Sequence, residues 1–220
     1  MRRRLAILAG VTMTALAVVV ALALAGGSET EPRPQGGGLT GAADTRALFR
    51  GIPQNGAVLG KADAPVTLVE YVDLQCPFCA QYATQVAPTL VRDYVRSGRL
   101  RIVQRTVPIL GPDSETAATW SVAAQRRDRL FEFNELFFRN QGQENSGYVT
   151  EEFLGKVARG AGLNPAEVAS AAAGLSPPGT AGVSSTPSFR LGRTGSSPKP
   201  LAVSRLSVDE FTGPIDRLLR

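Results

Sequence analysis

The hydrophobic pattern of residues 42–220 changes between strand-like and helix-like periods. Residues 66–72 (VTLVEYV) are mostly apolar and β-branched, which predicts a buried strand. Apolar positions on one broad face then continue to about Arg96 and predict a helix that Pro88 interrupts. A second strand is expected over about 100–107. Strand, helix and strand form a βαβ unit, whose crossover should be right-handed.

The middle of the chain is predicted to be helical. Asp113 or Ser114 is a candidate cap for the first of these helices. Asn164 followed by a proline predicts the start of the last. The helices are expected over about 114–124, 130–138, 150–160 and from 165. The aromatic-rich stretch 120–138 is typical of a core, and a substrate groove is the alternative.

The last section returns to β-type patterns. Strands are expected at 188–191 and 201–204, joined by a turn rich in Gly, Ser and Pro, and a final helix at about 208–219. The order βαβ, helices, ββα predicts the α/β class: a thioredoxin-like fold with a helical insertion.

The N-terminal segment indicates export. Residues 5–25 carry no charge and match the ~20 apolar residues that cross a bilayer, and Arg2, Arg3 and Arg4 precede them. We expect residues 1–25 to form an uncleaved signal anchor or transmembrane helix. A cleaved signal peptide is the alternative. Residues 26–41, rich in Gly and Pro, are expected to form a flexible linker. Either reading places the domain at 42–220 outside the cytoplasm.

Composition excludes several kinds of chemistry. The 220 residues include two cysteines and no histidine. Triads and metal sites that use histidine are therefore impossible, and nothing predicts a metal or a cofactor. The net charge of +5 includes the arginine cluster at the N-terminus, so the remainder is nearly balanced. We expect no nucleic-acid partner.

The two cysteines form a C-x-x-C motif, Cys76-Pro77-Phe78-Cys79, between a predicted strand and a predicted helix. A helix N-terminus stabilises an anion and lowers the pKa of a thiol there. Cys76 is therefore the predicted nucleophile, and Cys79 the thiol that resolves a mixed disulfide. A structural disulfide is the alternative, but so short a loop would remove little chain entropy.

Glu70 is a charged residue within the apolar strand before the motif. If it points inward, burial should raise its pKa, and near a thiol it could exchange the proton of disulfide chemistry. A partly exposed glutamate at a sheet edge is the alternative. For Asp73 two readings stay open: a role beside the motif, or only the end of the strand.

Two joined motifs resemble the DsbA-like branch of the thioredoxin superfamily. They are 69–80 (VEYVDLQCPFCA) and 182–189 (GVSSTPSF), and the likeness covers roughly 48–212, including a lead-in at 51–65 typical of membrane-anchored bacterial members. The resemblance implies a cis peptide between Thr186 and Pro187, packed against the C-x-x-C. It also implies a client chain that pairs with the neighbouring backbone, and an acidic residue at the place of Glu70.

The sequence departs from many relatives in two places. Pro77 and Phe78 stand between the two cysteines, where many relatives have a histidine. Phe78 offers no cationic partner, so we do not expect the very low thiol pKa of DsbA at Cys76. The stretch 167–186 is short and rich in Ala, Gly and Pro, which indicates a more open groove beside the site.

Together these features predict an extracytoplasmic thiol-disulfide oxidoreductase. Its expected partners are exported proteins bearing thiols or disulfides, a membrane redox partner that recycles the C-x-x-C, and the cell membrane. Oxidase, isomerase and reductase remain alternatives. The competing hypothesis is a tethered peptide-binding module without redox turnover.

Overall fold

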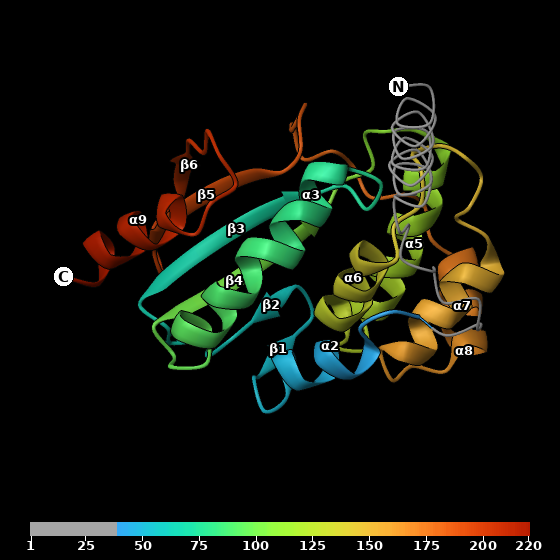
Figure 1. Cartoon of the computed structure of the whole chain (residues 1–220), viewed down its shortest axis with the longest axis horizontal. Coiled ribbons are helices and arrows are strands. Elements are labelled where there is room, and N and C mark those ends of the chain that lie inside the picture. Colours follow the sequence, from blue (N-terminus) through green and yellow to red (C-terminus); the bar gives the residue numbers. More distant parts are fainter. Residues whose placement is uncertain (1–38) are drawn as a thin grey trace, which may run out of the picture. The chain divides into compact units, whose positions relative to one another are not determined.

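A mixed six-stranded sheet organises residues 39–220, the part of the chain that the computed structural model describes (Figure 1). The strand order is β1-β2-β4-β3-β5-β6. The strands are β1 (Gln54–Asn55), β2 (Val58–Leu59), β3 (Val66–Val72), β4 (Leu100–Thr106), β5 (Ser188–Arg193) and β6 (Lys199–Leu201). Only β3 and β4 pair in parallel, with Val66 opposite Leu100 and Val72 opposite Thr106. The predicted βαβ unit is confirmed, and β3 lies at the centre of the sheet.

The helical connection from β3 to β4 runs without a break from residue 77 to 95. It consists of α3 (Pro77–Gln81), η1 (Tyr82–Val86), α4 (Ala87–Leu90) and η2 (Val91–Val95). Pro88 has no N–H for the usual bond, and the amide of Ala87 donates to the carbonyl of Tyr82, five residues back. The predicted interruption at Pro88 thus takes the form of widened helical turns.

The helical insertion contains α5 (Pro112–Gln125), α6 (Leu130–Arg139), α7 (Glu151–Gly160) and α8 (Pro165–Ala173). Thr150 and Asn164 cap α7 and α8 through their side chains. The cap predicted for α5 was wrong: Gly111 precedes the helix and Pro112 opens it. Ser114 lies inside α5, where its hydroxyl is used for another contact described below.

The C-terminal hairpin is shifted from its predicted position. The second strand is β6, at Lys199–Leu201, and β5 extends to Arg193. The carboxylate of Glu210 accepts hydrogen bonds from the amides of Ser204 and Arg205, both at 2.8 Å. These contacts hold the chain toward the terminal helix, α9 (Asp209–Leu219), so residues 202–204 leave the sheet.

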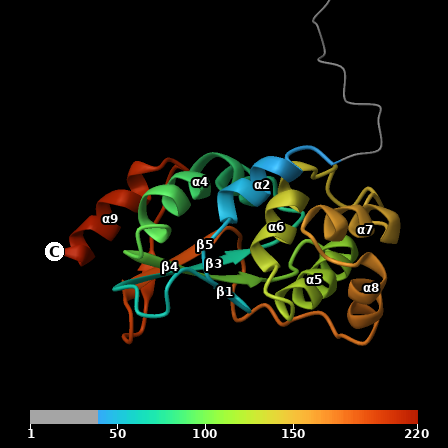
Figure 2. The same cartoon turned by 90° about the horizontal axis from the view of Figure 1, so that it is seen from below.

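Two apolar cores meet near the end of β3. One lies between the sheet, the 77–95 helical run and α9, where the rings of Tyr82, Phe189 and Phe211 pack in tilted and edge-to-face pairs. The other fills the helical insertion and includes both Cys76 and Cys79. In Figure 2, α2 (Ala42–Phe49), α4 and α9 lie on one side of the sheet. The cysteines therefore lie where the insertion joins the sheet.

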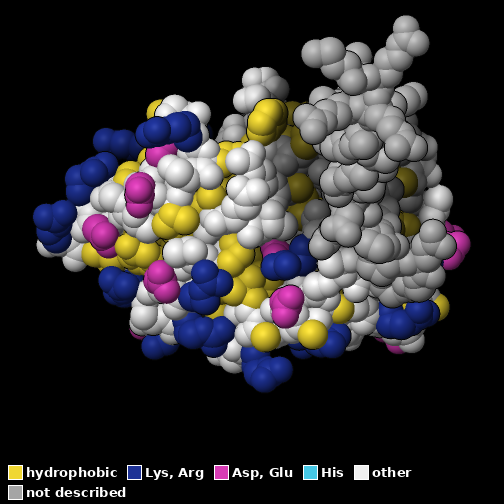
Figure 3. Space-filling model, in the orientation of Figure 1, with side chains coloured by type: hydrophobic (Ala, Val, Ile, Leu, Met, Phe, Trp, Pro, Cys, Tyr) yellow, Lys and Arg dark blue, Asp and Glu magenta, His cyan; other side chains and the backbone are white. Residues whose placement is uncertain are grey.

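The predicted membrane helix at 5–25 and most of the linker at 26–41 lie outside the described residues. Within residues 39–220, no helix is long and apolar enough to cross a membrane. Leu39, the first described residue, packs against the insertion core. In Figure 3 the Lys and Arg side chains are spread along the edge of the visible face rather than gathered in one patch.

Candidate active site at the start of α3

Cys76 and Cys79 lie at the first turn of α3. Cys76 occupies the cap position, its carbonyl accepts the amide of Ala80 at 3.1 Å, and Pro77 is the first helical residue. Pro77 suits this position because the amide it lacks would have no helical partner. Both thiols are free, and their residues are buried, with 4 % of Cys76 and 0 % of Cys79 exposed. The local sequence therefore places the Cys76 sulfur at the N-terminus of α3 and the Cys79 sulfur one helical turn further along.

The two thiols titrate in opposite directions. The pKa of Cys76 is lowered to about 6, chiefly by a hydrogen bond from the Cys79 thiol. Burial opposes this shift, while the side chain of Thr186 and the backbone of Cys79 and Phe78 assist it. The pKa of Cys79 is raised, first by burial and then by its interactions with Cys76. This difference favours Cys76 as the nucleophile and Cys79 as the resolving thiol.

The loop that contains Thr186 and Pro187 reaches the first cysteine through Thr186. The bond between them is cis, as the resemblance implied. The Cys76 sulfur donates to the Thr186 carbonyl at 3.3 Å. Antiparallel pairing of β3 with β5, in which Tyr71 lies opposite Ser188, brings this loop to the end of β3. The structure thus joins Cys76, Cys79 and Thr186 from segments more than a hundred residues apart in the chain.

Glu70 is 2 % exposed and points into the helix-covered core, which excludes the edge position. Its carboxylate accepts hydrogen bonds from the Tyr82 hydroxyl and from the Gln104 side chain. Burial is the main reason that its pKa is raised to about 7. The inward orientation and the raised pKa that the sequence predicted are confirmed. No hydrogen bond joins Glu70 to either thiol, so its part in proton exchange stays a proposal.

Asp73 fastens the loop before the active site and does much more than end a strand. It is fully buried and accepts hydrogen bonds from four donors: the amides of Gln75, Ile109 and Leu110, at 2.8, 2.7 and 3.0 Å, and the Ser114 hydroxyl at 2.6 Å. Sequence reasoning missed this role. The donors lie up to 41 positions away, and no periodic pattern marks them.

Gln141 forms a second tie to the same loop. Its side-chain amide donates to the carbonyls of Leu74 and Cys76, at 2.7 and 3.2 Å. Gln75 is likewise held by the Ser114 hydroxyl and by Asn145. The insertion therefore fixes the backbone on which Cys76 sits. These residues too were not predicted from the sequence.

Phe78 and Pro77 form the exposed rim of the site. Phe78 is 62 % exposed, and no other large hydrophobic side chain among residues 39–220 is exposed to that degree. Phe78 adds no charge beside the thiols. In the same part of the chain no three Cys, Asp or Glu side chains converge as metal ligands do. The chemistry that these residues can perform is thiol exchange.

A C-x-x-C at a helix start, opposite a cis-proline loop in a thioredoxin-like fold, defines the class of thiol-disulfide exchange sites. The family model described as "Thioredoxin" matches residues 53–202, so the chain belongs to that family. Probable disulfide bond formation protein D of Bacillus cereus is 33 % identical over 98 residues, which are 44 % of this chain and 45 % of that protein. The chain spans about half the length of the curated relatives that it matches.

Solved structures with the same fold include DsbA-like proteins. Oxidised BdbD of Bacillus subtilis has a TM-score of 0.61 at 24 % identity, over 76 % of this chain and 97 % of that one. Reduced DsbG of Mycobacterium tuberculosis also has a TM-score of 0.61, at 18 % identity, over 81 % and 92 %. The chain therefore has the DsbA-like thioredoxin fold that the sequence predicted.

Proposed function

We propose that this protein exchanges thiols and disulfides in exported proteins through Cys76 and Cys79. The observation that carries the proposal is the Cys76 thiol, whose pKa is lowered to about 6 beside the Thr186 carbonyl. A pKa of 6 makes about 90 % of that thiol a thiolate at pH 7, against about 3 % at the ordinary value of ~8.5. The similarity to disulfide bond formation proteins supports the same activity.

The reaction balances with the two cysteines and one client disulfide. The Cys76 thiolate attacks one client sulfur, forms a mixed disulfide and releases the other client sulfur as a thiolate. Cys79 then loses its proton and attacks the Cys76 sulfur, which forms the Cys76–Cys79 disulfide and releases the second client thiolate. The reverse sequence oxidises a client dithiol. Glu70 is the buried carboxyl we propose as the acceptor of the Cys79 proton, through an intervening water.

The pKa of Cys76 also supports a direction of exchange. It lies between those of thioredoxin, about 7, and DsbA, about 3.5. A more stable thiolate stabilises the reduced form and makes the disulfide more oxidising. We therefore place the pair between these two proteins in oxidising strength. Equilibration with glutathione buffers, read by alkylation of free thiols, measures the potential directly.

We further propose that residues 5–25 anchor the protein in the cell membrane with the catalytic domain outside the cytoplasm, where a membrane redox partner recycles it. The apolar segment behind three arginines supports this topology. A cysteine-free reporter fused after Arg220 should be protease-accessible in spheroplasts and stay with membranes after a salt wash. A soluble protein with a new N-terminus near Gly26 would remove the anchor from the proposal.

Insulin reduction and the refolding of a reduced, disulfide-containing protein test the activity. The wild-type protein should be active in at least one of them, and Cys76→Ser in neither. A wild-type protein that is inactive in both, yet binds unfolded chains, would indicate a peptide-binding module instead.

A further inference from the structure

The segment between α8 and β5, residues 174–187, has no regular structure and borders three hollows in succession. Pro177 lines the first, Pro178 the second and Pro187 the third. The last part of the segment reaches the active site, since the Thr186 carbonyl accepts the Cys76 thiol. A client chain that lies along this segment would pass from the catalytic sulfur to the first hollow.

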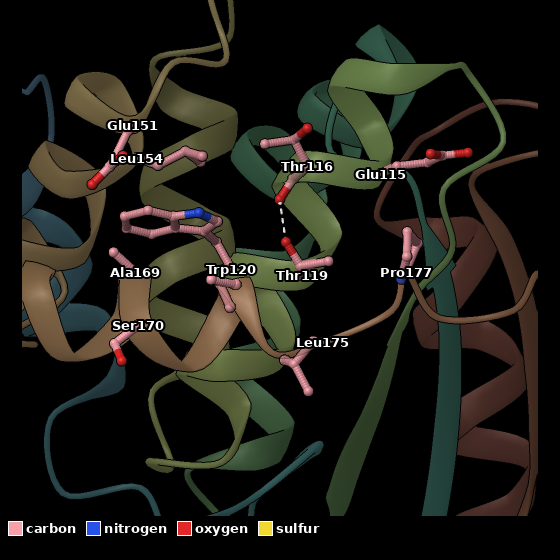
Figure 4. Close-up of a pocket in the computed structure, with 12 residues that line it drawn as sticks. Glu115, Thr116, Thr119, Trp120, Glu151, Leu154, Ala169, Ser170, Leu175 and Pro177 are labelled. Atoms are coloured by element: carbon pink, nitrogen blue, oxygen red, sulfur yellow. Dashed lines mark hydrogen bonds between the residues drawn. The ribbon is translucent and has the colours of Figure 1, made fainter.

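The first hollow is an open groove of about 640 Å³ between α5, α7 and α8. That volume lies within the ~300–1,000 Å³ of typical ligand sites. Figure 4 shows the Trp120 indole between Leu154 and Ala169, and these apolar side chains, with Leu175, provide its floor. The groove is joined to the active site through α5, because Ser114, at the start of that helix, donates to Asp73.

Two carboxylates, Glu115 and Glu151, border the groove from its two ends (Figure 4). Both residues are exposed, and neither side chain forms a hydrogen bond or an ion pair with another of the described residues. Neighbouring carboxylates differ: Glu152 pairs with Lys156 at 2.8 Å, and Glu167 accepts a hydrogen bond from Asn164. None of the residues that line the groove is Lys or Arg. Among the described residues, the groove therefore combines an apolar floor with two carboxylates that no positive side chain compensates.

We propose that this acidic groove docks client segments in which Arg or Lys adjoins apolar residues. The apolar neighbours would cover Trp120 and Leu154 while the positive charge meets Glu115 or Glu151. The inference rests on the proposed thiol exchange and names a class of client for it. Ten residues separate Pro177 from Pro187, a span of at most about 34 Å. The basic segment should therefore lie within about ten residues of the reacting cysteine.

The second hollow predicts which spacing between the basic segment and the cysteine is favoured. Arg105 lines it, together with Tyr71 and Pro178. A client charge that stops short of the acidic groove meets this arginine instead of a carboxylate. Clients with the basic segment about nine residues from the cysteine should therefore react faster than clients with a spacing of about three.

The test uses the reduced full-length protein in detergent and synthetic peptides with one glutathionylated cysteine. Each peptide carries Leu-Arg-Leu, Leu-Gln-Leu or Leu-Glu-Leu at about three or nine residues from the cysteine, on either side. One turnover oxidises Cys76 and Cys79 to a disulfide and releases the peptide thiol and glutathione. The rate is followed by stopped flow with the variants E115Q/E151Q and S170Y, the latter to fill the groove. The control E152Q/E167Q makes the same charge change outside it.

We expect the second-order rate constant for the Arg peptide at the longer spacing to exceed that for the Glu peptide by about threefold to tenfold at low salt. E115Q/E151Q and S170Y should abolish the difference, E152Q/E167Q should keep it, and salt should reduce it. Equal rates for all peptides, or loss of the rate difference in E152Q/E167Q as well, would overturn the proposal that the groove docks basic segments. The proposed thiol exchange would stand. Failure to reduce any peptide would refute the proposed function itself. If the wild-type protein sediments as a dimer and E115Q/E151Q as a monomer, a second copy of the chain occupies the groove. That result would overturn the proposal that the groove binds clients.

Discussion

Replacing Thr186 by valine tests how the site sets the pKa of Cys76. Four groups in the site favour the thiolate: the Cys79 thiol first, then the Thr186 side chain, then the backbone of Cys79 and that of Phe78. Thr186→Val removes only the hydroxyl. The Thr186 carbonyl, which accepts a hydrogen bond from the Cys76 thiol, stays in place. The variant therefore separates stabilisation of the thiolate from stabilisation of the thiol.

The expected size follows from one hydrogen bond to a charged group, about 1.5–3 kcal/mol net. Since one pKa unit is about 1.4 kcal/mol, the pKa of Cys76 should rise from about 6 by about one to two units. For a rise of one unit, the thiolate fraction at pH 6 falls from about one half to about one tenth. Alkylation at pH 6 should then slow about fivefold, whereas at pH 9 the two proteins should react at similar rates.

The assay is thiolate absorbance of the reduced protein against pH, checked by the rate of iodoacetamide alkylation. Ser185→Ala is the matched control, because Ser185 is exposed and adjoins Thr186. The control should titrate like the wild type. An unchanged midpoint in Thr186→Val, or a wild-type midpoint near 8.5, would refute the account of the thiolate given above.

Three further predictions concern the groups around the nucleophile. Cys79→Ser should trap mixed disulfides, visible on non-reducing gels, and Cys79 should be the slower thiol to alkylate at neutral pH. The Glu70 pKa is about 7 in the folded state against 4.5 ordinarily, so stability should fall as pH rises from 4.5 to 7. Glu70 accounts for at most about 3 kcal/mol of this change in the free energy of unfolding. Glu70→Gln should not show that part of the pH dependence in urea unfolding. Identical pH profiles of stability for the variant and the wild type would contradict this. Asp73→Asn puts an amide against backbone amides and should lower the free energy of unfolding by about 2–4 kcal/mol in the same assay. A loss under about 1 kcal/mol would show that the hydrogen bonds to Asp73 are dispensable for stability.

The sheet and the helix that carry the cysteines could be predicted because their signals are local. Residues 66–72 form a strand that is almost wholly buried, and such strands have near-continuous apolar sequences. The hairpin was misplaced for the opposite reason. Its second strand ends at Leu201 because Glu210, several residues further on, binds the amides of Ser204 and Arg205. A tertiary contact of this kind leaves no periodic trace in the strand itself.

The site residues likewise divide into those that the local sequence identified and those that it did not. Cys76 and Cys79 are adjacent on one turn, so spacing alone identified them. Thr186 entered through the resemblance, since nothing local links it to a cysteine 110 positions away. Asp73 and Gln141 were missed because their partners are backbone groups. Every residue but proline offers both backbone groups, so the sequence does not show which ones a side chain binds.

Burial alone does not explain why the two thiols behave differently. Cys76 and Cys79 are almost equally inaccessible, at 4 % and 0 % exposed, and burial raises the pKa of both. At Cys79 burial is the largest cause of the raised pKa. At Cys76 burial is outweighed by hydrogen bonds from the Cys79 thiol, the Thr186 side chain and two backbone groups. At Cys79 the corresponding hydrogen bond with Cys76 acts in the other direction and keeps the proton on. A change that leaves both cysteines buried but removes these donors should therefore make the two thiols more alike in pKa, and with it slow the first attack more than the resolving step.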